Sequence, residues 1–197
     1  MARKLSLDGG PSVAEEILTG AARLFYDRGY DATSIRDLAE TIGISSSTLY
    51  HHYTNKQEIL RAVLHRFMVN FNAAIIPVLR DPALSATERV REATRMHLEI
   101  TDERRPELLR FTQFRNVLDE AQLRPLIQLQ WDYHDAVKSA IKEGRDTGEF
   151  TVDDVDLATM AILDMLNGVR SWFSHSGALS MNDVVQRYVT MIDKLLS

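Results

Sequence analysis

The sequence contains no cysteine, which excludes disulfide bonds, thiol nucleophiles and cysteine-ligated metals and suits a reducing compartment. Long hydrophobic runs are also missing, because the longest stretch, at residues 73–76, ends at Pro77 and is far too short to span a bilayer. No apolar segment of signal-peptide length lies near the N-terminus. We therefore expect a cytoplasmic protein that does not act at a membrane.

An excess of positive charge is missing too, since the formal net charge is −5. Even the first 56 residues hold only six Lys or Arg against seven Asp or Glu. Any contact with nucleic acid must therefore come from a few well-placed cations, hydroxyl groups and helix N-termini.

The common signatures of enzymes are also absent. The chain has no His-x3-His or Glu-x2-His metal spacing, no glycine-rich phosphate loop and no Gly-x-Ser-x-Gly elbow. We expect no cofactor and no metal. A helical enzyme that uses His97, His134 and a carboxylate stays open as a remote alternative.

What the sequence does contain is helical periodicity along its whole length, with 45% apolar residues to form a core. Only residues 150–152 have any strand character. The spacing of apolar residues, caps and breakers predicts an all-α protein of about nine helices. They lie at about residues 12–28, 34–42, 45–53, 54–81, 86–103, 106–119, 122–147, 153–174 and 180–196.

The second and third of these helices carry the most informative pattern. Gly43 makes a tight turn between them, Ile44 is the buried residue of that turn, and Ser45 caps the third helix. Small polar side chains followed by Tyr50 and His51 then face outward if Leu49 faces inward. This is the layout of a helix-turn-helix that reads the DNA major groove.

These residues resemble the N-terminal domain of the TetR family of transcriptional repressors. The resemblance covers about 45 residues without a gap. It implies a three-helix DNA-binding domain at residues 1–56 and a helical ligand-binding and dimerisation domain at residues 57–197. It also implies a two-fold dimer that a small molecule releases from palindromic operator DNA. The matching pattern is Ile17-Leu18-x2-Ala21-x2-Leu24-Phe25-x3-Gly29-Tyr30-x2-Thr33-Ser34-x3-Leu38-Ala39-x3-Gly43-Ile44-Ser45-x2-Thr48-Leu49-Tyr50-x-His52-Tyr53-x2-Lys56-x2-Ile59-Leu60.

The residues that we expect to contact DNA lie on and around the recognition helix. Thr48 and Tyr50 match contact positions of the family pattern, and Thr33 and Arg36 look like clamps on the DNA backbone. Lys56 lies in the first turn of the next helix, where a cation opposes the helix dipole, so a phosphate contact would explain it. The full set is Thr33, Ser34, Arg36, Ser45, Ser46, Ser47, Thr48, Tyr50, His51, His52 and Lys56.

A second resemblance covers residues 143–180, where Glu143-Gly144-x3-Gly148-Glu149-Phe150 is similar to a TetR subgroup that senses acyl-CoA thioesters. It implies an acyl-CoA effector. Polar or aromatic residues on faces that otherwise look like core are the candidate ligand contacts. They are Phe67, Phe71, His97, Phe111, Phe114, Arg115, Trp131, His134, Arg170 and Trp172, each of which plain packing would also explain.

The last two predicted helices carry more apolar surface than one small domain needs to bury, so we expect them to form a homodimer interface. Two alternatives on the same fold remain. In the first alternative the chain activates transcription instead of repressing it, and in the second it senses hydrophobic drugs.

Overall fold

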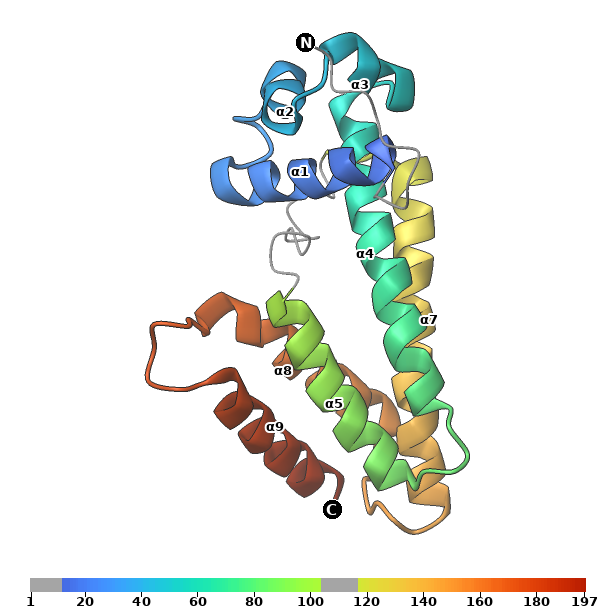
Figure 1. Ribbon diagram of the computed structural model, residues 1–197. Helices are drawn as coiled ribbons and strands as arrows, with labels where there is room; N and C mark the ends of the chain where they lie inside the picture. Colours follow the sequence, from blue (N-terminus) through green and yellow to red (C-terminus); the bar gives the residue numbers. More distant parts are fainter. Residues whose placement is uncertain (1–11, 104–116) are drawn as a thin grey trace. The chain divides into compact units, whose positions relative to one another are not determined.

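Eight α-helices and no strand make up residues 12–103 and 117–197, which the computed structural model describes (Figure 1). The prediction of an all-α chain is confirmed. The expected helix at 106–119 falls largely on residues 104–116, outside the described part, and residues 117–119 form a turn. The helices are α1 (Val13–Arg28), α2 (Ile35–Ile42), α3 (Ser46–His52), α4 (Lys56–Leu79), α5 (Ala86–Glu103), α7 (Glu120–Asp146), α8 (Val155–Trp172) and α9 (Met181–Leu196).

The described residues form two compact units, and the long helices α4 and α7 contribute to both. The first unit holds residues 12–67 and 117–126, and the second holds residues 68–103 and 127–197. Each unit has buried hydrophobic residues of its own.

Caps and glycines set the helix ends of the first unit. Ser12 caps α1 and Ser34 caps α2, each in a reciprocal pair with the acidic residue three positions later. Gly43 ends α2 in the left-handed conformation at φ 78°, which a residue with a Cβ adopts only at a cost. Its amide, and that of Ile44, donate to the Ala39 carbonyl. The turn between α2 and α3 is therefore specified by local chemistry.

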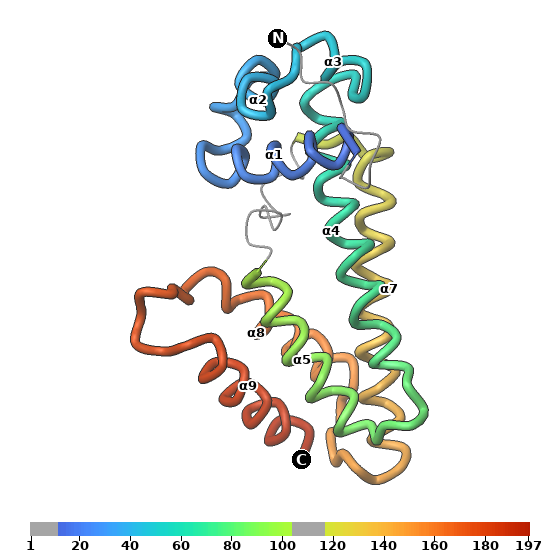
Figure 2. The backbone as a smooth tube through the Cα atoms, in the orientation of Figure 1, coloured from blue at the N-terminus to red at the C-terminus, as the bar shows by residue number. Residues whose placement is uncertain are grey.

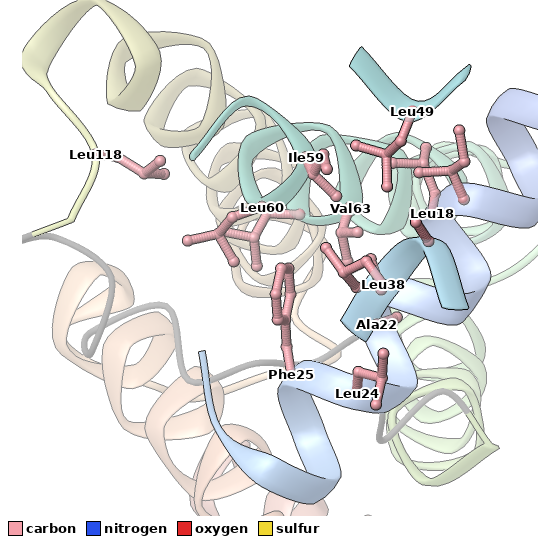
Figure 3. Packing of buried hydrophobic residues seen from close by; sticks show 14 of the residues in the cluster. Leu18, Ala22, Leu24, Phe25, Leu38, Leu49, Ile59, Leu60, Val63 and Leu118 are labelled. Carbon is pink, nitrogen blue, oxygen red and sulfur yellow. The ribbon is translucent and has the colours of Figure 1, made fainter. Parts of the chain in front are cut away.

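Apolar side chains from α1, α2, α3 and α4 meet in the core of the first unit (Figure 3). Leu38 and Leu49 are fully buried there against Ile59 and Leu60 of α4. Leu118 and Leu126, much later in the sequence, join the same cluster. The outward faces of α2 and α3 follow from this packing, because each helix has only one face that the core covers.

In the second unit, α5 lies beside α8 and α9, and Figures 1 and 2 both show α5 and α9 side by side. Nε of Arg91 on α5 donates a hydrogen bond of 3.0 Å to Oδ1 of Asp193 on α9. The buried core is built from every helix of this unit. It includes Ile75, Val90, Leu98, Ile141, Ile162, Leu166, Val185 and Ile192.

Among the described helices, α4 alone is long and apolar enough for a membrane span by length and composition. Its apolar residues have another explanation, because Ile59, Leu60 and Val63 are fully buried in the core of the first unit. A core helix satisfies the same length and composition criteria as a membrane helix.

Candidate functional site

The exposed face of α3 carries an aromatic and imidazole cluster. Leu49 points into the core with no exposed surface, whereas Tyr50 is 55% exposed. His51 and His52 are exposed beside it, with their rings edge to face at a centroid distance of 5.8 Å. An exposed tyrosine next to two imidazoles offers hydrogen-bonding groups and flat rings to a partner in solvent.

The first turn of α3 is ordered by its own hydroxyl groups. Ser45 Oγ accepts from the Thr48 amide at 3.0 Å and lies 2.8 Å from the Thr48 hydroxyl. Ser46 is half-buried and Ser47 is exposed. Ser45 is thus a helix cap, while Ser47 stands on the same outward face as Tyr50 and His51, three and four residues away.

Thr33, expected from the sequence to contact the DNA backbone, is buried in the structure. Its side chain is buried at 1% exposure, and its hydroxyl donates to the Gly29 carbonyl at 2.8 Å. This bond joins the end of α1 to the start of α2, so the side chain holds the turn and does not face solvent. Ser34 and Arg36 are exposed, although the Ser34 hydroxyl is already paired with Asp37.

Lys56 also has an internal role that the sequence did not reveal. Its ammonium donates to the Tyr30 and Thr33 carbonyls, both at 2.9 Å, and lies 4.1 Å from the centre of the Tyr30 ring. These contacts explain a cation in the first turn of α4 without any phosphate. Lys56 ties α4 to the turn that positions α2, which makes it a support of the DNA-facing surface.

In the second unit, a buried polar pair lies where α4, α5 and α7 meet. Each of these helices carries candidate ligand residues. His97 of α5 is 3% exposed, and its Nδ1 lies 3.0 Å from the hydroxyl oxygen of Tyr133 on α7. Phe71 of α4 stands edge to face against both rings. Burial, helped by the positive charge of Arg170, lowers the pKa of His97 to about 3, so its imidazole is neutral.

Sequence reasoning missed two buried polar residues of the second unit. Burial raises the pKa of Tyr133 well above its usual range, so it stays a phenol. Asn72, also buried, donates to the Leu129 carbonyl at 2.8 Å. Both are polar residues on otherwise apolar helical faces, the same signal that singled out His97, and it would have found them.

Three of the other candidate ligand residues, Trp131, His134 and Trp172, are not part of this buried centre. Trp131 is 53% exposed and contacts His134, whose Nδ1 pairs with Asp135 at 3.0 Å. Trp172 is 52% exposed and stacks on a tyrosine of α9. Phe67 is buried on α4, and Arg170 is half-buried on α8. Phe111, Phe114 and Arg115 lie outside the described residues.

The motif at residues 143–150 serves the fold. Glu143 binds the guanidinium of Arg89 through both oxygens at 2.7 Å. Glu149 accepts from the Ala86 and Thr87 amides, so it caps α5. A Cβ on Gly144 would lie 2.2 Å from the Phe150 ring. The motif therefore joins the start of α5 to the end of α7, and an acyl-CoA effector cannot be inferred from it alone.

Apolar side chains are exposed along α8 and α9. Many apolar residues of these two helices are buried within the chain itself, among them Val155, Leu166, Val169, Val184, Val185 and Ile192. Met160 is 53% exposed, Leu157 is 64% exposed and Met191 is 43% exposed. Large exposed apolar residues on neighbouring helices mark a surface suited to a partner.

Comparisons with known proteins cover both units. Residues 17–63 match the family model "Bacterial regulatory proteins, tetR family", and residues 83–196 match "Tetracyclin repressor-like, C-terminal domain". The HTH-type transcriptional repressor KstR2 of Mycolicibacterium smegmatis is 28% identical over 180 residues, which cover 90% of this chain and 87% of that protein.

Solved structures share the fold. The TetR family transcriptional regulator PfmR from Thermus thermophilus has a TM-score of 0.84 at 30% identity, covering 92% of this chain and 98% of that chain. AibR, solved with isovaleryl coenzyme A and operator DNA, has a TM-score of 0.82 at 24% identity, covering 90% and 96%.

Proposed function

Because the chain belongs to the TetR family of transcriptional regulators, we propose that it is a repressor that binds palindromic operator DNA as a homodimer. In this proposal, a small molecule that binds to residues 57–197 releases the protein from the DNA. Its relatives are regulators and not enzymes. In this proposal residues 1–56 form the DNA-binding head, residues 57–197 form the effector-binding and dimerisation body, and the protein works in the cytoplasm.

The observation that carries the proposal is the outward face of α3. Ser47, Tyr50 and His51 share this face, while Leu49 anchors the helix to the core. A helix held by its caps and its buried face can enter the major groove and present these groups to base edges and phosphates. Arg36 adds an exposed cation on α2.

The dimer is proposed through α8 and α9. Leu157, Met160 and Met191 expose apolar side chains there, and pairing with a second copy would bury them. A two-fold dimer presents two copies of α3, which matches a palindromic site with half-sites about one helical turn apart.

An acyl-CoA thioester is the proposed effector class. AibR, a protein of the same fold, was solved with isovaleryl coenzyme A. In this chain the half-buried Arg170 supplies a cation on α8, and Phe71, His97 and Tyr133 supply an aromatic, uncharged interior. A cation suits the phosphates of coenzyme A, and an apolar interior suits an acyl chain.

The test begins with selection of bound duplexes from a random DNA library by the purified protein at moderate salt. An enriched palindrome supports the dimeric repressor, and isovaleryl coenzyme A should then weaken binding to it. If no sequence is enriched by folded protein, the DNA-binding proposal is wrong. If coenzyme A thioesters neither weaken binding nor raise the melting temperature, the effector class is wrong.

Tyr50→Ala tests the face of α3 directly. Loss of a specific contact should weaken operator binding by about 1–3 kcal/mol. Tyr26→Ala is the matched control, because Tyr26 is a tyrosine of α1 with a similar exposure of 51%. Equal operator affinity of the two variants would remove Tyr50 from the proposed contacts. Thermal unfolding of both variants checks that the fold is intact.

A further inference from the structure

The centre of the second unit contains a buried polar atom without a partner. His97 Nε2 is buried and makes no hydrogen bond among the described residues, although Nδ1 of the same ring is paired with Tyr133. A buried nitrogen without a partner costs about 1–3 kcal/mol, so its persistence calls for a reason.

The tautomer of His97 follows from the accounting of donors. If Tyr133 donates its hydroxyl proton to Nδ1, then Nε2 carries the ring proton, and a single N–H is left without an acceptor. If Nδ1–H donated to Tyr133 instead, two groups would lack a partner, the hydroxyl proton of Tyr133 and the lone pair of Nε2. No other bond to that hydroxyl is present among the described residues. The first arrangement leaves fewer groups unpaired, so Nε2 is an N–H donor.

We propose that His97 Nε2–H binds the thioester carbonyl oxygen of the effector, so that this residue distinguishes an acyl-CoA from a coenzyme A derivative without the carbonyl. The proposal rests on the proposed function, in which an acyl-CoA occupies the body. Tyr133 is the positioning residue, because its hydroxyl holds the imidazole in the donating tautomer. His97 thereby gains a partner that the described residues do not provide.

The chemistry of the pair selects a neutral acceptor. The low pKa of His97 and the high pKa of Tyr133 keep both groups uncharged at neutral pH. A neutral N–H satisfies a carbonyl oxygen, and the positive charge of Arg170, which also acts on His97, is left for the phosphates of coenzyme A. Phe71, edge to face with both rings, encloses the pair in apolar surroundings.

A second buried atom of this unit has the opposite polarity. Asn72 Oδ1 is buried and has no partner among the described residues, while its Nδ2 donates to the Leu129 carbonyl one turn before Tyr133 on α7. This bond fixes Oδ1 as an acceptor. Residues 129 and 133 of α7, the partners of Asn72 and His97, lie one turn apart, so α7 receives both polar side chains on neighbouring turns.

Binding is measured by calorimetry on the full chain with two probes, isovaleryl coenzyme A and its thioether analogue S-isopentyl coenzyme A, which lacks only the carbonyl oxygen. Wild type should bind the thioester at least about tenfold more tightly, the value of a buried hydrogen bond whose donor is otherwise unpaired. His97→Phe should abolish this preference and keep the thioether affinity, whereas His97→Gln, which keeps an N–H donor, should retain part of it.

The ring nitrogens of His97 provide a readout that needs no ligand. Nitrogen-15 spectra of the free protein should show the Nε2-protonated tautomer, and Tyr133→Phe should reduce its share. The Nδ1-protonated tautomer in wild type would overturn the assignment of His97, and so would equal affinity for the two probes. If the thioester still releases the protein from DNA in either case, the proposed function stands. Binding of neither probe would overturn both the thioester assignment and the effector class.

Discussion

The buried imidazole of His97 should make the stability of the second unit depend on pH. In the folded chain burial lowers its pKa to about 3, whereas in an unfolded chain the value is about 6.5. Between these values the unfolded state binds a proton that the folded state excludes. The free energy of unfolding therefore falls as the pH falls from about 6.5 toward 3.

The magnitude at one pH follows directly. A pH of about 5 is about 1.5 units below the pKa of the imidazole in the unfolded chain. Protonation of the unfolded state therefore favours unfolding by about 2 kcal/mol. This value holds for any folded pKa well below 5. At about pH 7.5 the contribution is close to zero, because neither state is protonated.

The assay is urea unfolding followed by circular dichroism at both pH values and at one protein concentration. Wild type should lose about 2 kcal/mol more between them than His97→Gln, which cannot titrate. His51→Gln is the control, because His51 is a histidine exposed on α3 and not buried like His97. Equal pH dependence of wild type and His97→Gln would refute the buried neutral imidazole.

Three further substitutions, with Gly168→Ala as a control, test the supports of the two units by urea unfolding. Lys56→Met removes two hydrogen bonds to carbonyls and should cost about 1–3 kcal/mol, and unchanged stability would mean that the ammonium is solvated. Gly144→Ala should cost about 1–3 kcal/mol through its clash with Phe150. Gly168→Ala, with nothing near its Cβ, should instead gain up to about 1 kcal/mol, and equal effects at the two glycines would contradict the clash. Glu149→Ala removes the cap of α5 and should cost about 1 kcal/mol. Hydrogen bonds from Thr87 lower the pKa of Glu149, so this contribution should disappear as the pH falls through that lowered value, and a variant whose deficit persists in acid would contradict it.

Local chemistry explains why much of the first unit could be predicted. Ser34, Gly43 and Ser45 act within three or four residues of themselves, so their effect on helix ends can be read from the sequence. The inward position of Leu49 and the outward position of Tyr50 then follow from helical periodicity.

Contacts between distant residues explain the errors and omissions. Lys56 was assigned to phosphate because its partners, the Tyr30 and Thr33 carbonyls, lie more than twenty residues earlier. The pairing of His97 with Tyr133 spans a similar gap. Periodicity places each side chain on a face of its own helix, but it does not say which other helix covers that face.

The sequence by itself determined the helices, the turn between α2 and α3, the face of α3 that meets solvent, and the family. These features depend on bonds and periodicities within a few residues. Only the tertiary structure decided which polar groups are already satisfied inside the chain, such as Thr33 and Lys56. It also decided which buried group has no partner among residues 12–103 and 117–197, as at His97 Nε2. Burial and hydrogen-bond partners arise when helices from different parts of the chain pack together, so no local pattern encodes them.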